Sequence, residues 1–182
     1  MITLQQQLIS TGGALLCAVI GSIHDLRDRR IPNWVTGPAI LAGLLLHSLT
    51  GHWSGLGYSA LAGLVAGTVA LVFWLAGGMG GGDVKLMIAV GCIAGWSSLH
   101  LLLFSIAIAG GVGAVVFSVY HKRLQQTLSN VIALLVHHGR QGLKPHPELN
   151  LDNPGTLRLP FALPIAAGCL VTLCGLVFGV RP

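Results

Sequence analysis

The stretch that decides the fold is Gly77-Gly78-Met79-Gly80-Gly81-Gly82-Asp83-Val84-Lys85-Leu86, in which a dense glycine tract is followed at once by a carboxylate and an ammonium group. Glycine reaches backbone conformations closed to other residues and costs extra entropy to order, so the tract favours a bent loop over a helix interior. Such a loop delivers Asp83 to the start of the next helix, where unpaired N–H groups and the helix dipole stabilise a carboxylate. Taken alone, the pattern also fits a flexible turn between two membrane helices.

The composition predicts a polytopic membrane protein with a single membrane-embedded domain over residues 1–182. Of the 182 residues, 53% are hydrophobic and 8% are charged, whereas soluble domains carry roughly 25% charged residues. The first apolar stretch lacks a basic region before it and a small-residue cleavage site after it, so it is not typical of a signal peptide. The four cysteines stand singly in apolar segments, which predicts packing residues and neither a zinc site nor a disulfide framework.

Six segments equal or approach the ~20 apolar residues that a helix needs to cross a bilayer. The predicted fold is therefore all-α, with about six transmembrane helices. The fourth segment is short, which predicts a tilted, kinked or partly re-entrant helix. Glycines recur in the third and fifth segments and suit close contact between helices in lipid. The six segments are residues 8–23, 34–49, 58–76, 84–96, 99–120 and 161–180.

The distribution of lysine and arginine predicts the topology. With six spans, three connections share one side of the membrane, and they carry nine of the ten basic residues. The positive-inside rule makes that side cytoplasmic, so both termini and the short connections at 51–57 and 97–98 are expected outside. This distribution explains the formal net charge of +5 without nucleic-acid binding.

The connection at residues 121–159 is the longest polar region of the sequence. Its apolar residues fall at helical spacing, which predicts an amphipathic helix on the membrane surface; a substrate-guiding element is the functional alternative. His137 and His138 have no further ligands at useful spacing, so we expect no metal site there. Residues 141–155 contain three prolines and predict an irregular loop. The apolar positions are Leu124, Leu128, Val131, Ile132, Leu135 and Val136.

Three of the five acidic residues, Asp25, Asp28 and Asp83, lie at the ends of predicted membrane segments on the predicted cytoplasmic side. Ionisable residues at membrane depth are costly and are functional candidates by default. Asp25 and Asp28 are three residues apart, so they share a face if the first helix continues. For Asp28, an ordinary ion pair with Arg29 or Arg30 is the simpler interpretation.

Two aspartates from separate helices at one membrane face suggest an aspartyl protease. Two close carboxylates cannot both ionise easily, so they share a proton. One then acts as a base on water while the other, protonated, polarises the scissile carbonyl. HExxH, GxSxG and Walker motifs do not occur in a credible setting. The competing hypothesis is a small transporter or assembly subunit that uses the same aspartates as a proton or cation site, and a plain scaffold is third.

Three stretches of the sequence resemble the type IV prepilin peptidases. Asp25-Leu26-Arg27-Asp28-Arg29-Arg30-Ile31-Pro32-Asn33 resembles the first motif of that family, an aspartate followed by a Leu/Ile-Pro-Asn/Asp element. Gly80-Gly81-Gly82-Asp83-Val84-Lys85-Leu86 resembles the second motif, GxGD followed by a lysine. Residues 159–168 are similar to the family's proline-rich entry into its last helix.

The resemblance implies that Asp25 and Asp83 are the catalytic pair. Asp25 is preferred to Asp28 because it precedes Pro32 by seven residues. Lys85 either tunes or positions Asp83, or has only a topological role. The supporting residues that the resemblance implies are Gly80, Gly82, Lys85, Pro32, Asn33 and Asp28.

The resemblance further implies an aspartic-type endopeptidase that removes the basic leader from type IV prepilins or pseudopilins. The reaction is expected at the cytoplasmic face of the bacterial inner membrane, without a cofactor or metal. The expected partners are a substrate with a basic leader and an apolar helix, and the lipid bilayer. Longer members carry an N-terminal zinc region associated with N-methylation. Only a few residues precede the first segment, which predicts the short form, similar to members that serve tight-adherence pili, without methyltransferase activity.

Overall fold

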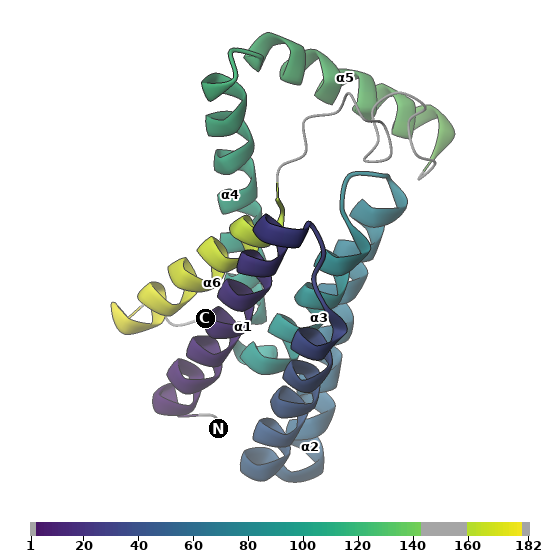
Figure 1. The fold of residues 1–182 in the computed structure, drawn as a ribbon. Helices are drawn as coiled ribbons and strands as arrows, with labels where there is room; N and C mark the ends of the chain where they lie inside the picture. The colour runs from purple at the N-terminus through teal and green to yellow at the C-terminus, as the bar shows by residue number, and fades with distance from the viewer. Residues whose placement is uncertain (1–2, 143–159, 180–182) are drawn as a thin grey trace.

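The computed structural model describes residues 3–142 and 160–179, and within these ranges it contains helices and no β-strand. Three of the helices are long and apolar enough to cross a membrane, and the last is a shorter apolar helix. The predicted all-α membrane character is therefore confirmed, whereas the number of spans stays a prediction. The helices, shown in Figure 1, are α1 (Leu4–Asp28), α2 (Asn33–Leu75), α3 (Gly81–Ala94), α4 (Trp96–Tyr120), α5 (Leu124–Gln141) and α6 (Ala162–Val177).

Helix α1 has clear start and stop signals. The Thr3 hydroxyl accepts the backbone N–H of Gln6 at 3.3 Å, and the Gln6 side chain accepts the backbone N–H of Thr3 at 3.0 Å, which forms a capping box. At the other end, Arg29 adopts a left-handed conformation with φ of 51°. Pro32 then precedes α2, and the helical conformation is disfavoured for Ile31 because it stands directly before a proline. The first predicted span is thus longer than expected and includes Asp25 and Asp28.

Helix α2 corrects the predicted connection at residues 51–57. Helical turns continue from Asn33 to Leu75, and a single residue, His52, leaves the helical region with φ of 51° and ψ of −142°. Figure 1 shows the chain reversing direction in this helix, so that its two arms lie side by side. At the reversal Gly55 lies directly against the backbone carbonyl of His47, where a Cβ would collide. The expected loop at residues 51–57 is therefore replaced by a helix break at His52 and a close contact of Gly55 with His47.

Helix α3 is short, as predicted, and lies in the core. Most of its 14 residues are buried, among them Leu86 and Val90. It packs against α2 through small residues: a Cβ on Gly91 would lie 2.8 Å from the Ala66 Cβ and 2.9 Å from the Ala62 carbonyl oxygen.

The glycines of the third predicted segment lie equally close to α3: a Cβ on Gly63 would lie 3.1 Å from the Ile88 carbonyl oxygen, and one on Gly67 would lie 2.5 Å from the Ile88 Cγ1. The predicted close helix contact is therefore confirmed for Gly63 and Gly67.

The glycines of the fifth predicted segment behave differently. A Cβ on Gly111 of α4 would meet nothing within 4 Å, and one on Gly110 would make only ordinary contacts. Helices α4 and α6 instead approach at Gly168, where a Cβ would lie 2.7 Å from the backbone N and Cα of Ile106. The prediction of close contact was therefore wrong for Gly110 and Gly111.

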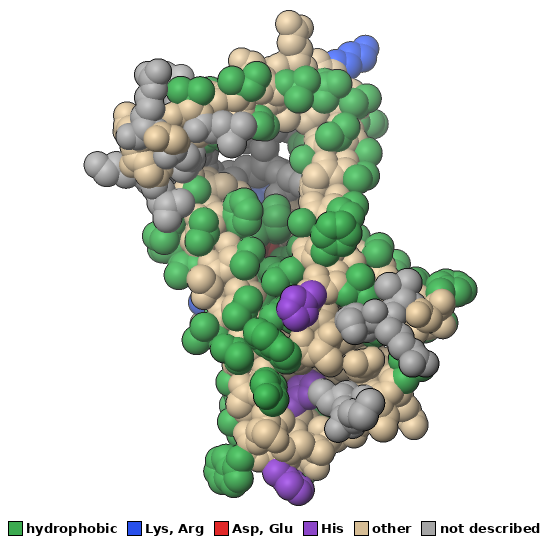
Figure 2. Space-filling model, turned by 180° about the vertical axis from the view of Figure 1, so that it is seen from behind, with side chains coloured by type: hydrophobic (Ala, Val, Ile, Leu, Met, Phe, Trp, Pro, Cys, Tyr) green, Lys and Arg blue, Asp and Glu red, His purple; other side chains and the backbone are tan. Residues whose placement is uncertain are grey.

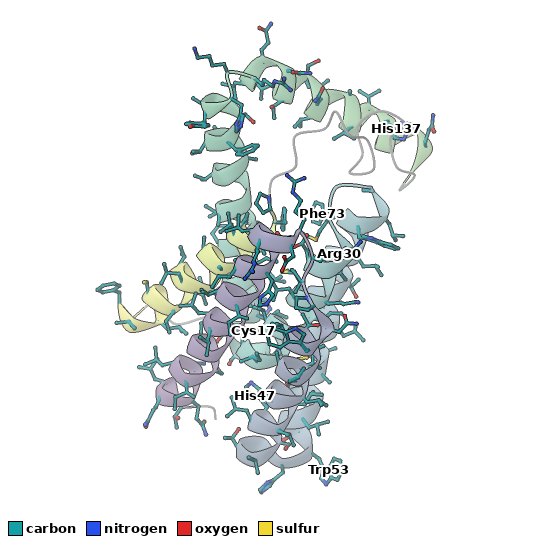
Figure 3. All side chains as sticks on the ribbon, viewed as in Figure 1. Cys17, Arg30, His47, Trp53, Phe73 and His137 are labelled. Carbon is teal, nitrogen blue, oxygen red and sulfur yellow. The ribbon has the colours of Figure 1, made fainter. Side chains whose placement is uncertain are left out.

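The polar connections gather at one end of the bundle. Figure 1 shows the α1–α2 connection, the α2–α3 loop and α5 at the same end, away from the N-terminus. In Figure 3 Arg30 and His137 lie toward this end, and His47 and Trp53 lie toward the other. The regions that the lysine and arginine count assigns to one side therefore lie toward one end of the molecule, although α5 packs only against α4 among the described helices.

Helix α5 crosses this end of the molecule (Figure 1). It confirms the helical part of the prediction for residues 121–159, and it leaves much of an apolar face exposed. Most of the predicted irregular loop at 141–155 lies outside the described residues. The exposed apolar side chains of α5 are Leu124, Leu128, Val131, Ile132 and Val136.

Candidate functional site

Asp83 lies in the first turn of α3, at the position that the glycine tract predicts. Its side chain is 8% exposed. One carboxylate oxygen, Oδ2, accepts the backbone N–H of Gly80 at 3.3 Å, which uses an N–H group left free at the start of the helix. The other oxygen, Oδ1, is buried and has no hydrogen-bond partner among the described residues.

Asp25 lies in the last turn of α1 and is partly buried. Its carboxylate accepts a hydrogen bond from the backbone N–H of Ala162, the first residue of α6. One turn earlier, the Ser22 hydroxyl donates to the Ala162 carbonyl oxygen at 2.8 Å. Two side chains of α1 therefore hold the start of α6, and the proline-rich entry into the last helix lies beside Asp25.

Asp25 lies at the C-terminal end of α1 and Asp83 at the N-terminal end of α3, near enough for the charge of Asp25 to act on Asp83. The two carboxylates interact electrostatically, and Arg29 acts on Asp25 in the opposite sense. Both residues lie in the part of the chain that the structure describes, and no hydrogen bond joins their side chains directly. Figure 2 shows a small acidic patch recessed behind apolar side chains. Asp28, one turn after Asp25, is exposed.

The two motif segments also touch away from the carboxylates. Ile31 is buried, and a Cβ on Gly82 would lie 3.3 Å from the Ile31 Cβ and 3.4 Å from its backbone N. The Lys85 ammonium donates a hydrogen bond to the Asn33 side-chain oxygen at 2.9 Å. Pro32 precedes the first turn of α2 and presents Asn33 at its start. The residues around the first motif and those around the second thus form one local unit.

The glycines of the tract have separate functions in the structure. Gly77 has a positive φ of 77° and forms the turn after α2. Gly80 precedes α3 and donates its N–H to Asp83, and Gly82 is already helical and lies close to Ile31. The predicted bent loop is therefore shorter than expected, because α3 begins at Gly81.

The arrangement is suited to acid–base chemistry by two carboxylates. Among the residues whose side chains the structure describes, no three His, Cys, Asp or Glu are grouped as metal ligands would be. Sequence reasoning missed Ser22 and the Ala162 backbone. Ser22 precedes Asp25 by three residues and so shares its helix face, which is a signal that the sequence does contain. The partner across the fold at Ala162 has no such local signal.

Comparisons with known proteins agree with the motifs. A sequence model of the type IV leader peptidase family matches residues 13–115. The chain is 35% identical over 109 residues to the prepilin leader peptidase/N-methyltransferase of Aeromonas hydrophila, covering 54% of this chain and 37% of that protein. For the proteins of the same name from Neisseria gonorrhoeae and Escherichia coli (strain K12), the identities are 36% over 123 residues and 33% over 133 residues.

These alignments cover only part of each relative. They include 61% of this chain and 42% of the Neisseria protein, and 66% of this chain and 58% of the Escherichia protein. The matched region thus spans less than two thirds of each of these curated relatives. No solved structure matches the chain.

Proposed function

Because the chain belongs to the type IV leader peptidase family, we propose that it is an aspartic-type endopeptidase that removes the leader peptide of type IV prepilins or pseudopilins. The observation that carries the proposal is the meeting of Asp25 and Asp83, from two separate motifs, at one end of the helix bundle. The relatives named as prepilin leader peptidases support the class of substrate. Of the two activities in those names, the paired carboxylates support the peptidase.

The proposed reaction uses one proton shared by the two carboxylates. The unprotonated carboxylate takes a proton from water, and the resulting hydroxide forms a bond to the scissile carbonyl carbon. The protonated carboxyl donates its proton to the carbonyl oxygen, which gives a neutral tetrahedral intermediate. Collapse of that intermediate breaks the C–N bond: the departing amine takes a proton from the carboxyl that had accepted it from water, and one hydroxyl of the intermediate returns its proton to the other carboxylate, which re-forms the carbonyl group.

The surroundings of each carboxylate fit this reaction. Asp83 Oδ1 has no hydrogen-bond partner among the described residues, so it is free to bond the reacting water or the substrate carbonyl. The N–H of Ala162 fixes one orientation of Asp25, and the N–H of Gly80 does the same for Asp83. Both aspartates are thus held by backbone groups whose positions depend on helix ends.

The proposed location is the cytoplasmic face of the bacterial inner membrane, with both termini outside the cytoplasm. Support comes from Arg27, which shares the last turn of α1 with Asp25, from Arg29 and Arg30, which follow that helix, and from Lys85 beside Asp83. Basic residues near span ends favour the cytoplasmic side. A substrate with an apolar helix would then reach the carboxylates from within the bilayer, with its basic leader in the cytoplasm.

The direct test is cleavage of a prepilin by the purified full chain in liposomes. The expected product lacks its leader, with the new N-terminus read by mass spectrometry, and the Asp83→Asn variant gives no product. Proton and cation flux across the same liposomes is the control for the competing transporter hypothesis. Flux that depends on Asp25 and Asp83, in the absence of any cleavage, would overturn the proposal.

A further inference from the structure

We infer that Lys85 and Asn33 form a positioning pair, in which the hydrogen bond between them, and not the charge of Lys85, fixes how Asp83 faces Asp25. The inference rests on the proposed function, because it takes these two carboxylates as the reacting groups. The sequence allows three roles for Lys85: to tune Asp83, to position it, or only to set the topology. The inference selects positioning.

The bond connects the two segments that carry the carboxylates. The Lys85 ammonium lies 2.9 Å from the Asn33 oxygen, across 52 positions of the chain. Lys85 follows Asp83 by two residues on α3, and Asn33 is the first residue of α2. Only the connector from Arg29 to Pro32 separates Asn33 from the helix that carries Asp25. A shift of Asn33 relative to Lys85 therefore moves Asp25 relative to Asp83.

Alignment has to come from such scaffold contacts. The two described carboxylates interact electrostatically but share no direct hydrogen bond. Ile31 packs on Gly82, which limits how closely the segments approach. An apolar contact of this kind sets a distance but allows sliding. A hydrogen bond weakens steeply away from its preferred angle, so the Lys85–Asn33 bond supplies the missing directional constraint.

The chemical nature of the Lys85 partner indicates that the hydrogen bond, and not the charge of Lys85, is what acts on the site. The acceptor of Lys85 is a neutral amide oxygen, and the charge that acts on Asp83 is that of Asp25. Lys85 and Asn33 are both exposed, so the bond adds little to overall stability. Its loss is expected to change the geometry of the site more than the stability of the fold.

Five variants of the protein, four single and one double, separate the two roles in the prepilin cleavage assay. Lys85→Met removes the donor, and Asn33→Leu removes the acceptor while leaving the charge of Lys85 in place. Each is expected to lower kcat by about tenfold or more with KM changed little, and the double variant is expected to be no worse, because the two residues act as a unit. Asn33→Asp keeps an acceptor for the Lys85 ammonium and is expected to retain most of the wild-type activity. Lys122→Met, which removes another exposed basic residue, is the matched control and should keep it.

A second readout does not depend on cleavage. Spin labels on Arg27→Cys and Gly81→Cys, with the four native cysteines replaced, report the distance between the end of α1 and the start of α3. Lys85→Met and Asn33→Leu are expected to shift or broaden that distance, and Lys122→Met is not. If the distance responds but the wild-type protein cleaves no prepilin, the proposed function fails while the pairing stands. An active Asn33→Leu enzyme beside an inactive Lys85→Met enzyme, or unchanged distances in both, would overturn the inference.

Discussion

At the scale of single residues, the two aspartates are held in different ways. Asp25 is tied to a different helix, through the N–H of Ala162, whereas Asp83 is tied to its own helix start, through the N–H of Gly80. Asp28 shares the last turn of α1 but is exposed. This difference in surroundings separates the proposed catalytic residue from its neighbour in the sequence.

Asparagine at either proposed catalytic position is expected to abolish cleavage. It keeps nearly the same shape as aspartate but cannot exchange a proton. Asp25→Asn and Asp83→Asn should each lose nearly all leader removal, and the double variant should be little worse, because residues acting as a unit are not additive. The assay is leader removal from a prepilin, with expression of each variant checked.

Asp28→Asn is the matched control for that series and should retain substantial activity. An active Asp25→Asn enzyme beside an inactive Asp28→Asn one would reverse the assignment of the first aspartate. Activity in Asp83→Asn would exclude the paired-carboxylate mechanism.

Gly82 is expected to tolerate no bulky side chain. Even a Cβ there would lie 3.3 Å from Ile31, and the two further methyl groups of valine have to displace the α1–α2 connection. Gly82→Val should therefore insert in the membrane but lose cleavage. The neighbouring Gly81 is exposed, and a Cβ there would lie 3.6 Å from the Trp74 ring nitrogen. Gly81→Val is the matched control; equal activity of the two variants would mean that the tract is only a connector.

The sequence predicts one half of the site better than the other. Asp83 at a helix start follows from the glycine tract that precedes it, because the signal is local. The contact of Asp25 with Ala162, and that of Lys85 with Asn33, join residues far apart in the chain. Such pairs depend on how whole helices pack, and a single sequence carries no spacing rule for them.

At the scale of elements, close contacts between helices depend on a few glycines. Gly91 allows α3 to approach α2, and Gly168 allows α6 to approach α4. In lipid, where burial from water does not drive helix association, such close van der Waals contact is a main source of stability. The sequence predicted that its apolar segments are helical, which the structure confirms. It did not predict the reversal within α2, because that depends on the backbone of one residue, His52, and on the contact of Gly55 with His47.

Gly168→Ala is expected to destabilise the protein. The added methyl group would lie 2.7 Å from the backbone of Ile106, which cannot move as a flexible side chain can. Overpacking of this kind costs about 1–3 kcal/mol. The expected result is a lower unfolding temperature in detergent, together with reduced cleavage, because α6 also carries the Ala162 N–H.

Gly111→Ala on α4 provides the comparison, since its Cβ would meet nothing within 4 Å. Replacing glycine by alanine inside a helix is favourable by about 0.5–1 kcal/mol. The unfolding temperature of Gly111→Ala should therefore equal or exceed that of the wild type. A Gly168→Ala protein as stable as Gly111→Ala would show that the α4–α6 contact is looser than the structure indicates.

At the scale of the whole molecule, apolar flanks separate two different ends. Figure 2 shows hydrophobic side chains over much of the surface between the ends. The connections that carry the motifs lie at one end, and the reversal of α2 near Trp53 lies at the other (Figures 1 and 3). An apolar flank between polar connections is the arrangement that a bilayer requires.

Cysteine labelling is expected to report these two ends as opposite sides of the membrane. In a protein without native cysteines, a cysteine at Gly51 should react with an impermeant thiol reagent added to intact cells. A cysteine at Gln141, at the end of α5, should react only after the cells are permeabilised. The reverse pattern would contradict both the topology and the proposed cytoplasmic location of the carboxylates.

The hydrogen bond between Asp25 and Ala162 has a consequence for synthesis of the protein. Asp25 belongs to α1, and the N–H that orients it belongs to α6, which is translated later. A nascent chain therefore carries both aspartates in the membrane well before α6 is made. We expect it to be inactive during that interval, so that the order of translation itself delays proteolysis until α6 has been inserted.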